Sequence, residues 1–402
     1  MPPKAKEEKK AVVRFGRVRS NLKMGLVGLP NVGKSSLFNL LCNASAAASN
    51  FAFCTIDPNE SRCVVPDQRF DYLCDLHKPA SKIPAYLHVT DIAGLIKGAS
   101  EGAGLGNAFL SHIAAVDGIF HLVRGFENDE IMHVDDSVDP VRDLETITSE
   151  LCMKDLDTID RAIENEKKEH KRTKMTKEME AYMALLEKIK AMLEANQPVR
   201  TGTWTAAEVE SVNERLKELI TTKPMIYLVN LSMEQFVKKR SRCLPLVQKW
   251  VDEHGGGTII PFSVEFEQKR WDLREDPAAL ETFMADAEGA KSALPRMVKI
   301  GYKQLHLIYF FTAGEQEVRC WTIQEGNLAP QAAGAIHTDF ERGFIKAEVV
   351  SYEDYKAYNN GKASMVDVKA AGKYRIEGKS YVVQDGDIIH FQFNVTADKK
   401  KK

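Results

Sequence analysis

The chain has 402 residues, of which 44% are hydrophobic and 28% are charged, and its formal net charge is −2. This length is enough for two or three domains with substantial cores, and the charge balance excludes a polycation that binds nucleic acid over its whole surface. Seven cysteines, an odd number with no C-x-x-C pair, argue against a disulfide framework and against a zinc ribbon.

At the start of the chain, residues 1–21 mix charges of both signs and contain no apolar signal core, so we expect a mobile tail. No apolar run anywhere in the chain reaches membrane-spanning length. With the cysteine usage, these features predict a cytoplasmic protein that makes no membrane contact, with the nucleus as an additional location.

From residue 22 to about 140, apolar strand-like runs alternate with helical segments, as at 24–27, 86–89 and 118–123. Such alternation predicts βαβ units and a parallel sheet that is covered by helices on both faces. Two further buried strands are expected at 225–229 and 258–262. The predicted fold class is therefore α/β, with one domain over residues 22–283.

Residues 145–220, inside that domain, have a different pattern. Apolar residues recur at helical spacing between Met183 and Leu193, and residues 164–180 hold five acids and six bases. We expect a long helical hairpin here, with its turn near residues 196–204 or earlier. Its charge run is either a solvated helix face or a functional basic surface.

The end of the chain is rich in short β-like runs, which follow a linker over residues 284–303. They lie at 305–310, 318–323, 345–350 and 381–395. We expect a small β-rich module over residues 304–395. It is followed by a basic tail, residues 396–402, whose lysines either contact RNA or serve solubility.

The most informative stretch is Gly28-x-x-x-x-Gly33-Lys34-Ser35, which follows a strand-like run and opens a helical segment. This spacing predicts a phosphate-binding P-loop. The two glycines let backbone N–H donors curl around a polyphosphate. Lys34 is expected to reach the β- and γ-phosphates, and the Ser35 hydroxyl is expected to bind Mg²⁺.

Two further positions narrow the chemistry. Asp91, which follows the strand at 86–89, is expected to support Mg²⁺ indirectly, through the groups that bind it, and the N–H of Gly94 is expected to approach the γ-phosphate. Thr55, in a loop before that strand, is expected to close over Mg²⁺ and sense the γ-phosphate. The alternative for Asp91 and Gly94 is an ordinary turn at the end of a strand, and the alternative for Thr55 is an ordinary loop threonine. The order of these motifs along the chain favours the switch roles.

The base preference is read from Asn230-Leu231-Ser232-Met233-Glu234, directly after the strand at 225–229. A GTPase normally has Asn-Lys-x-Asp here, and its carboxylate accepts two hydrogen bonds from guanine. Met233 takes the place of that acid, and a thioether is a poor acceptor. We expect a weak guanine preference, with Asn230 and the Leu231 backbone at an adenine edge. In the alternative, Glu234 shifts by one place and the protein uses GTP.

Six longer motifs are distinctive. They are Asp91-Ile-Ala-Gly-Leu-Ile-Lys-Gly-Ala-Ser, Gly102-Ala-Gly-Leu-Gly-Asn-Ala-Phe-Leu-Ser-His, Asn50-Phe-Ala-Phe-Cys-Thr-Ile-Asp-Pro-Asn, Arg124-Gly-Phe-Glu-Asn, Phe310-Phe-Thr-Ala-Gly and Ala329-Pro-Gln-Ala-Ala-Gly-Ala-Ile-His-Thr-Asp-Phe-Glu-Arg-Gly-Phe. These motifs resemble the Obg-related branch of P-loop NTPases, and within it the Obg-like ATPases of the YchF type. The resemblance covers residues 22–395. It implies an Obg-type G domain with a coiled-coil insertion and a C-terminal TGS domain of ubiquitin-like β-grasp fold. It also implies that ATP is used in preference to GTP, and that the chain contacts the large ribosomal subunit, other translation components or stress-related partners.

The resemblance also assigns residues. By position it places phosphate binding on Asn31, Val32, Gly33, Lys34, Ser35 and Ser36, magnesium on Ser35 and Thr55, and the adenine on Asn230 and Leu231 with Phe126 nearby. The alternative for Phe126, a core aromatic at a strand end, is slightly favoured. Two positions depart from the family pattern, because Met233 stands where the family has Glu and Ala52 where it has Pro.

Hydrolysis is expected to be slow. Many GTPases orient the attacking water with a Gln after Asp-x-x-Gly, and this chain has Leu95 there. His133 resembles a histidine that the family is thought to use, and its pKa range suits water positioning. In related NTPases, an Asn at the position of Asn31 accompanies a K⁺ ion that supplies charge. The alternatives are that His133 is an exposed loop histidine and that Asn31 is a solvent-facing loop asparagine, neither with a role in hydrolysis.

Three functions remain open from the sequence. The first is a switch that hydrolyses ATP and displays its nucleotide state through the helical and TGS parts. The second is a GTPase of the translation-factor kind. The third is a scaffold that binds RNA or the ribosome and uses the nucleotide as a structural ligand.

Overall fold

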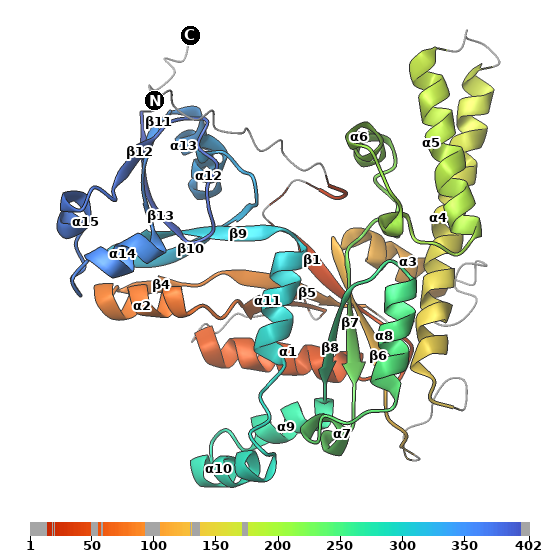
Figure 1. The fold of residues 1–402 in the computed structure, drawn as a ribbon, viewed down its shortest axis with the longest axis horizontal. Coiled ribbons are helices and arrows are strands. Elements are labelled where there is room, and N and C mark those ends of the chain that lie inside the picture. The colour runs from red at the N-terminus through yellow and green to blue at the C-terminus, as the bar shows by residue number, and fades with distance from the viewer. Residues whose placement is uncertain are drawn as a thin grey trace, which may run out of the picture.

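Two β-sheets organise the chain (Figure 1). In this computed structural model, residues 14–17, 19, 21–49, 55–57, 59–92, 105–128, 130, 137–170 and 176–394 are described. The first sheet has seven strands in the order β2-β3-β5-β1-β6-β7-β8, and the second has six in the order β12-β11-β13-β9-β10-β4. No helix within these described residues is long and apolar enough to cross a membrane.

The seven-stranded sheet contains the strands that the apolar runs predicted. Its parallel strands are β1 (Lys23–Val27), β5 (Tyr86–Asp91), β6 (Gly118–Arg124), β7 (Met225–Asn230) and β8 (Thr258–Phe262). Every residue of β6 and β7 is buried, as expected for central parallel strands that are covered on both faces. The α/β fold class is confirmed.

One edge of this sheet is antiparallel, in addition to the parallel strands that were expected. The strands β2 (Thr55–Asp57) and β3 (Glu60–Val64) pair antiparallel with each other, and β3 pairs antiparallel with β5. Two residues separate β2 from β3, which is too short for the crossover connection that parallel neighbours need. The expected parallel sheet is therefore extended at this edge by two antiparallel strands, and Thr55 lies in a short strand where a loop was expected.

Helices surround the sheet and share its core. They are α1 (Lys34–Ser49), α3 (Leu105–Ala115), α7 (Met233–Val237), α8 (Cys243–Glu253), α9 (Val264–Asp272) and α11 (Leu294–Gln304). The helix α10 (Pro277–Asp286) instead packs into a separate small cluster around Phe266. Side chains fix where α7 and α9 begin, because the hydroxyls of Ser232 and Ser263 accept backbone N–H groups of the first turn. Both helices therefore start at a defined residue after β7 and β8.

A helical arm projects from this layer (Figure 1). It consists of α4 (Pro140–His170), α5 (Lys177–Glu194), η2 (Val199–Thr201) and α6 (Ala206–Arg215), and it has a small core of its own. The connection between α4 and α5 falls at residues 171–175, outside the described residues. Residues 196–204, where one turn was expected, hold η2 and lead into α6.

The second sheet builds the C-terminal domain. Its strands β9 (Leu307–Ala313), β10 (Glu317–Gln324), β11 (Phe344–Ser351), β12 (Arg375–Glu377) and β13 (Asp387–Phe393) are accompanied by α12 (Ala329–Ile336), α13 (Thr338–Arg342), α14 (Tyr352–Tyr358) and α15 (Val366–Ala370). Its outer strand β4 (Ser81–Ile83) comes from the first half of the chain and pairs parallel with β10. The two halves of the chain therefore share one sheet.

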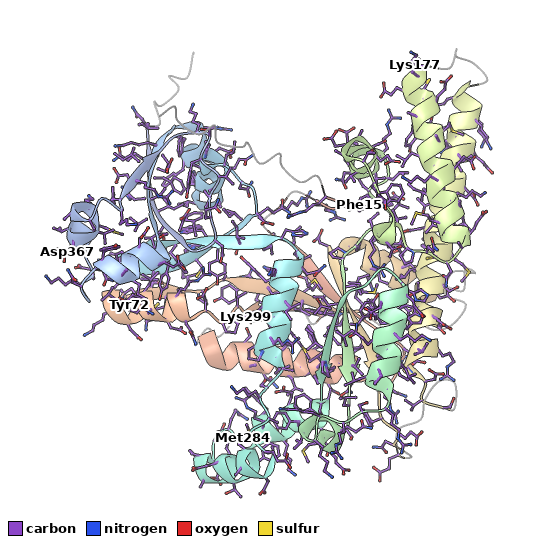
Figure 2. The ribbon with its side chains drawn as sticks, in the orientation of Figure 1. Phe15, Tyr72, Lys177, Met284, Lys299 and Asp367 are labelled. Carbon is purple, nitrogen blue, oxygen red and sulfur yellow. The ribbon has the colours of Figure 1, made fainter. Side chains whose placement is uncertain are left out.

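Polar contacts from α2 (Gln68–His77) reinforce this junction. The Arg69 guanidinium pairs with Asp67 at 2.7 Å and with Asp385 at 2.9 Å, and it lies 5.4 Å from the centroid of the Tyr309 ring. Asp67 also accepts the Tyr309 hydroxyl. Tyr72, from the same helix, bonds Asn359 and lies where α2 meets the C-terminal domain (Figure 2). We infer that the C-terminal domain moves together with α2 and β4.

Residues 14–17, which we call the N-terminal strap, bind the helical arm. The Asn213 amide on α6 donates to the carbonyl of Arg14 at 2.8 Å and accepts the N–H of Gly16 at 3.0 Å. The Phe15 ring meets Trp204 edge to face, 5.9 Å between centroids, and Figure 2 shows it between the arm and the C-terminal domain. The expected mobile tail is therefore held in place at these four residues.

The same strap contacts two other parts of the molecule. Arg14 pairs with Glu325 at 2.7 Å, and Gln324 donates to the carbonyl of Arg17 at 2.9 Å, both from the end of β10 and the turn after it. Arg17 donates to the carbonyl of Ala114 at 3.2 Å, near the end of α3. The strap thus joins the arm, the C-terminal domain and the helix that follows the Asp91 segment.

The histidine inside β6 makes stability depend on pH. His121 is fully buried, and neither ring nitrogen has a hydrogen-bond partner within the described part of the chain. Burial, with a smaller effect from Arg200, lowers its pKa from 6.5 to about 3. The folded state therefore disfavours protonation, so stability present above pH 6.5 is lost as the pH falls toward 3.

We expect this residue alone to remove about 2 kcal/mol of unfolding free energy between pH 7.5 and pH 5. The His121→Phe variant should lose that part of the pH dependence in urea denaturation, and the exposed control His390→Phe should keep it. Equal slopes for both variants would contradict the assignment.

Candidate nucleotide-binding site

The loop between β1 and α1 curls at the carboxyl edge of the sheet. Asn31 and Gly33 both have left-handed backbone, with φ of 61° and 101°. A Cβ on Gly28 would lie 2.6 Å from the carbonyl oxygen of Leu122, and one on Gly33 would lie 2.8 Å from the Asn230 amide nitrogen. The loop needs glycine at these two positions to pack this closely.

Lys34 begins α1 and folds back over the loop. Its side chain is buried, and Nζ donates to the carbonyl of Leu29 at 2.7 Å. Burial lowers the pKa of Lys34 to about 8, and the nearby Asp91 carboxylate offsets part of this effect. A phosphate at the loop would offer this ammonium a charged partner in place of one carbonyl.

Ser35 and Asp91 meet beside Lys34. The Ser35 hydroxyl donates to Asp91 Oδ2 at 2.9 Å, because β5 pairs with β1 and carries Asp91 to the same edge. The other carboxylate oxygen, Oδ1, is buried and has no hydrogen-bond partner among the described residues. A hydroxyl beside a carboxylate with an unsatisfied oxygen is a donor set that fits Mg²⁺.

Only some of the remaining residues that were expected to bind phosphate or act as switches lie within the described part of the chain. Val32 is buried in the loop, and Ser36 is exposed on the first turn of α1. Thr55 lies in β2, but its side chain is not among those described. Gly94, Leu95 and His133 fall outside the described residues, as does Ala52.

Asn230, at the end of β7, ties two loops together. Its amide Nδ2 donates to the carbonyl of Val32 at 3.0 Å, and its Oδ1 accepts the N–H of Val264 at 3.1 Å. The side chain is buried. Asn230 therefore fixes the phosphate loop against the loop after β8, a structural role that sequence reasoning did not foresee, while its contact with the base stays a prediction.

The other two residues expected at the base lie beside Asn230. Leu231 is buried, and its N–H donates to the carbonyl of Phe262 at 2.8 Å. Phe126 is half-buried in the loop after β6, where the Arg124 guanidinium lies 4.9 Å from its ring centroid. The N–H of Gly125 donates to the carbonyl of Asn230 at 2.8 Å. These contacts bring Phe126, Asn230 and Leu231 to one edge of the sheet.

Position 233 carries a methionine instead of an acid, and the neighbouring acid, Glu234, is engaged in an ion pair. Met233, the first residue of α7, packs against an apolar cluster that includes Phe266. Glu234 is exposed and pairs with Lys238 at 2.6 Å, which lowers the pKa of Glu234. A shift of Glu234 toward a guanine would require leaving this pair and reorienting the start of α7.

Sequence reasoning missed Val264 and Glu265, which follow β8. Val264 holds Asn230, and Glu265 Oε2 accepts the N–H of Met233 at 3.2 Å. The expected strand at 258–262 is the neighbour of β7 in the sheet. The residues after its end could therefore have been placed at the same edge as Asn230.

Two family models match the chain. One, described as "50S ribosome-binding GTPase", matches residues 23–155. The other is the C-terminal region of YchF GTPases, described as "Protein of unknown function (DUF933)", and it matches residues 307–394. Together they cover the nucleotide loop with part of the arm and the C-terminal domain.

Individual relatives are similar over the whole length. Obg-like ATPase 1 of Oryza sativa subsp. japonica is 53% identical over 404 residues, which is all of both chains. Obg-like ATPase 1 of Homo sapiens is 52% identical over 391 residues, 96% of each chain. The solved structure of the Schizosaccharomyces pombe YchF GTPase is 45% identical, with a TM-score of 0.85, and covers 95% of this chain and all of its own. These names differ on the nucleotide, ATP or GTP.

Proposed function

Because this chain belongs to the Obg-like ATPase (YchF) family of P-loop nucleotide-binding proteins, we propose that it is a nucleotide-dependent switch that binds and hydrolyses ATP in preference to GTP. The observation that carries the ATP preference is Met233. Its thioether replaces the carboxylate that guanine requires, and it packs into an apolar cluster. Sites that lack a required hydrogen-bonding group discriminate strongly against the ligand that needs it.

The phosphates are held by the loop between β1 and α1. The N–H groups of residues 31–36 and the Lys34 ammonium bind the triphosphate at the N-terminus of α1, where the helix dipole also favours negative charge. Ser35 is a ligand of Mg²⁺, with Asp91 as its supporting carboxylate and Thr55 as the second expected ligand. When bound, the metal neutralises charge on the phosphate oxygens.

Replacing Asp91 with asparagine tests the metal part of this proposal. Asp91→Asn keeps the shape but removes the charge that faces Ser35. We expect ATP hydrolysis to fall by about 100-fold or more, and the Mg²⁺ concentration for half-maximal rate to rise. The control is Asp286→Asn, an exposed carboxylate at the end of α10. An unchanged Mg²⁺ requirement in Asp91→Asn would refute the assigned role.

Turnover is proposed to be slow, because Leu95 stands where a water-orienting Gln is usual. His133 is one candidate to position the water, and a K⁺ ion beside Asn31 is another source of charge. His133→Ala should cut turnover while ATP affinity stays nearly intact. Replacing K⁺ with Na⁺ should slow hydrolysis if Asn31 acts through K⁺. An unchanged rate in either experiment would dismiss that candidate.

The proposed partner is the ribosome, through its large subunit, or another translation component. It is supported by the description of the family model that matches residues 23–155. The helical arm and the C-terminal domain are the surfaces expected to report the nucleotide state. Co-sedimentation with ribosomes should differ between ATP-bound, ADP-bound and nucleotide-free protein. Equal, salt-sensitive binding in every state would favour the scaffold alternative.

A GTPase is the second candidate function, and it is favoured by the similarity to the solved structure of the Schizosaccharomyces pombe YchF GTPase. Steady-state hydrolysis of ATP and GTP, measured side by side, tests the choice. Our proposal predicts the larger kcat/KM for ATP, and the larger kcat/KM for GTP would support the GTPase.

A further inference from the structure

We propose that Glu267 couples the nucleotide site to the C-terminal domain, by fixing the start of α11 to α9. It is a positioning residue, which acts through these two helices and not on the nucleotide directly. The inference rests on the proposed function, because it requires a nucleotide in the phosphate loop. It adds the connection through which binding of that nucleotide reaches the C-terminal domain.

The connection begins where the phosphate loop packs against the first turn of α9. The Asn230 amide joins the two, because its Nδ2 donates to the carbonyl of Val32 at 3.0 Å and its Oδ1 accepts the N–H of Val264, the first residue of α9, at 3.1 Å. A Cβ on Gly33 would lie 3.2 Å from Val264 Cγ2, so the loop backbone lies directly against this side chain. Phosphates that bind the N–H groups of the loop would therefore also fix the start of α9.

About one turn further along, α9 carries a buried carboxylate. Glu267 is only 2% exposed. Its Oε1 accepts the N–H of Ala293 at 2.7 Å, and its Oε2 accepts the hydroxyl of Ser292 at 2.8 Å. Burial raises the pKa of Glu267, and the bonds from these two donors oppose that effect. Ser292 and Ala293 directly precede α11, so a single side chain of α9 holds the beginning of this helix.

The helix α11 leads from this contact into the C-terminal domain (Figure 1). Gly301 presses it onto the first sheet, since a Cβ there would lie 2.6 Å from Phe120 Cζ. The neighbouring Tyr302 hydroxyl donates to Thr322 Oγ1 on β10 at 2.9 Å. Two residues separate the end of α11 from the start of β9. A change in the order of α11 therefore reaches both β9 and β10.

The carboxylate is a short connection between helices that are far apart along the chain. Residues 273–293, which include α10, separate α9 from α11. The bonds of Glu267 span this separation in one side chain, and charge-assisted bonds in a buried place are strong. Packed side chains and hydrogen bonds of this kind can carry the ordering caused by a ligand from one site to another.

Hydrogen exchange of the full chain, with and without ADP and Mg²⁺, tests this coupling. In wild type, ADP should slow exchange in the phosphate loop and, by about 5-fold or more, at Ala293 and the first turns of α11. Glu267→Gln keeps the shape and one acceptor oxygen but loses the charge. ADP should still protect its phosphate loop, whereas the effect at α11 should fall below about 2-fold.

Two further variants complete the experiment. Asp272→Asn, at an exposed carboxylate on the same helix, should respond to ADP as wild type does. Ser292→Ala removes one of the two donors, so it should reduce the response of α11 by less than Glu267→Gln. If Glu267→Gln does not fold, Ser292→Ala decides, and a wild-type response in that variant would overturn the inference.

The outcomes separate this inference from the proposed function. A purely structural role would speed exchange at α11 by the same factor with and without ADP, and this result would overturn the inference. The inference is also wrong if ADP protects the phosphate loop of wild type but leaves α11 unchanged. If GDP but not ADP gives the protection, the ATP preference fails and the coupling stands. If neither nucleotide protects the phosphate loop, the proposed switch fails together with the coupling.

Discussion

Replacing Lys34 with methionine should reduce ATP hydrolysis by about 100-fold or more and weaken nucleotide binding. Methionine keeps most of the aliphatic stem but removes the ammonium that is buried against the Leu29 carbonyl. That ammonium is the nearest full positive charge that the loop offers to the phosphates. The fold should survive, because the lost interaction is one hydrogen bond from a charge that burial already disfavours.

Two further variants serve as controls for this prediction. Lys299→Met, on an exposed lysine of α11 that Figure 2 labels, should leave hydrolysis unchanged. Lys34→Arg keeps the charge but not its compact shape, so it should recover part of the binding and little of the rate. Wild-type hydrolysis in Lys34→Met would show that the loop does not act through this residue.

Nucleotide affinity should also fall as the pH rises above about 8. Burial lowers the pKa of Lys34 to about 8 in the free protein, whereas bound phosphates favour the charged form. Above that pH, binding must therefore take up a proton, and the dissociation constant should rise by up to about 10-fold per pH unit. Titration between pH 7 and 9 checks this, and a flat profile would contradict the role of the ammonium.

Replacing Asp155 with alanine should lower the free energy of unfolding by about 3–5 kcal/mol. This carboxylate on α4 is buried and accepts the N–H groups of Ile220 and Thr221 at 2.9 and 2.7 Å, and the Thr221 hydroxyl at 2.6 Å. Burial raises the pKa of Asp155 to about 6, against the effect of these donors. Its removal leaves three buried donors without an acceptor at the base of the helical arm.

The segment held by Asp155 leads directly to Lys223, which donates to the carbonyls of Ile113 and Ala114 at 2.6 and 2.8 Å. The loss should therefore loosen both the arm and the end of α3. Asp160→Ala is the matched control on the same helix, because Asp160 is half-exposed and pairs with Lys190 at the surface. It should cost less than about 1 kcal/mol. Urea denaturation measures both variants, and equal costs would contradict the account.

The sequence predicted the phosphate loop well because its requirements are local. The spacing of Gly28, Gly33 and Lys34 specifies a turn between a strand and a helix, and the structure has that turn. The central strands could be predicted equally well from their apolar runs, since strands buried on both faces need continuous hydrophobic residues.

Contacts between distant segments could not be predicted in this way. The strand β4 is three residues long, Ser-Lys-Ile, and its pairing with β10 is set by how the two halves of the chain dock. The strap at residues 14–17 is held by Asn213 and Glu325, about 200 and 300 positions away. Asn230 was assigned to the base because its sequence position suggested it, whereas its bonds to Val32 and Val264 depend on the folded loops.

The central claim is that this phosphate site holds an adenine nucleotide, because the acid that guanine needs is absent from position 233. Calorimetric titration of the wild-type chain with ADP and with GDP, in the presence of Mg²⁺, tests it most directly. We predict that ADP binds more tightly than GDP. Tighter binding of GDP would contradict the base preference, and binding of neither would contradict the site itself.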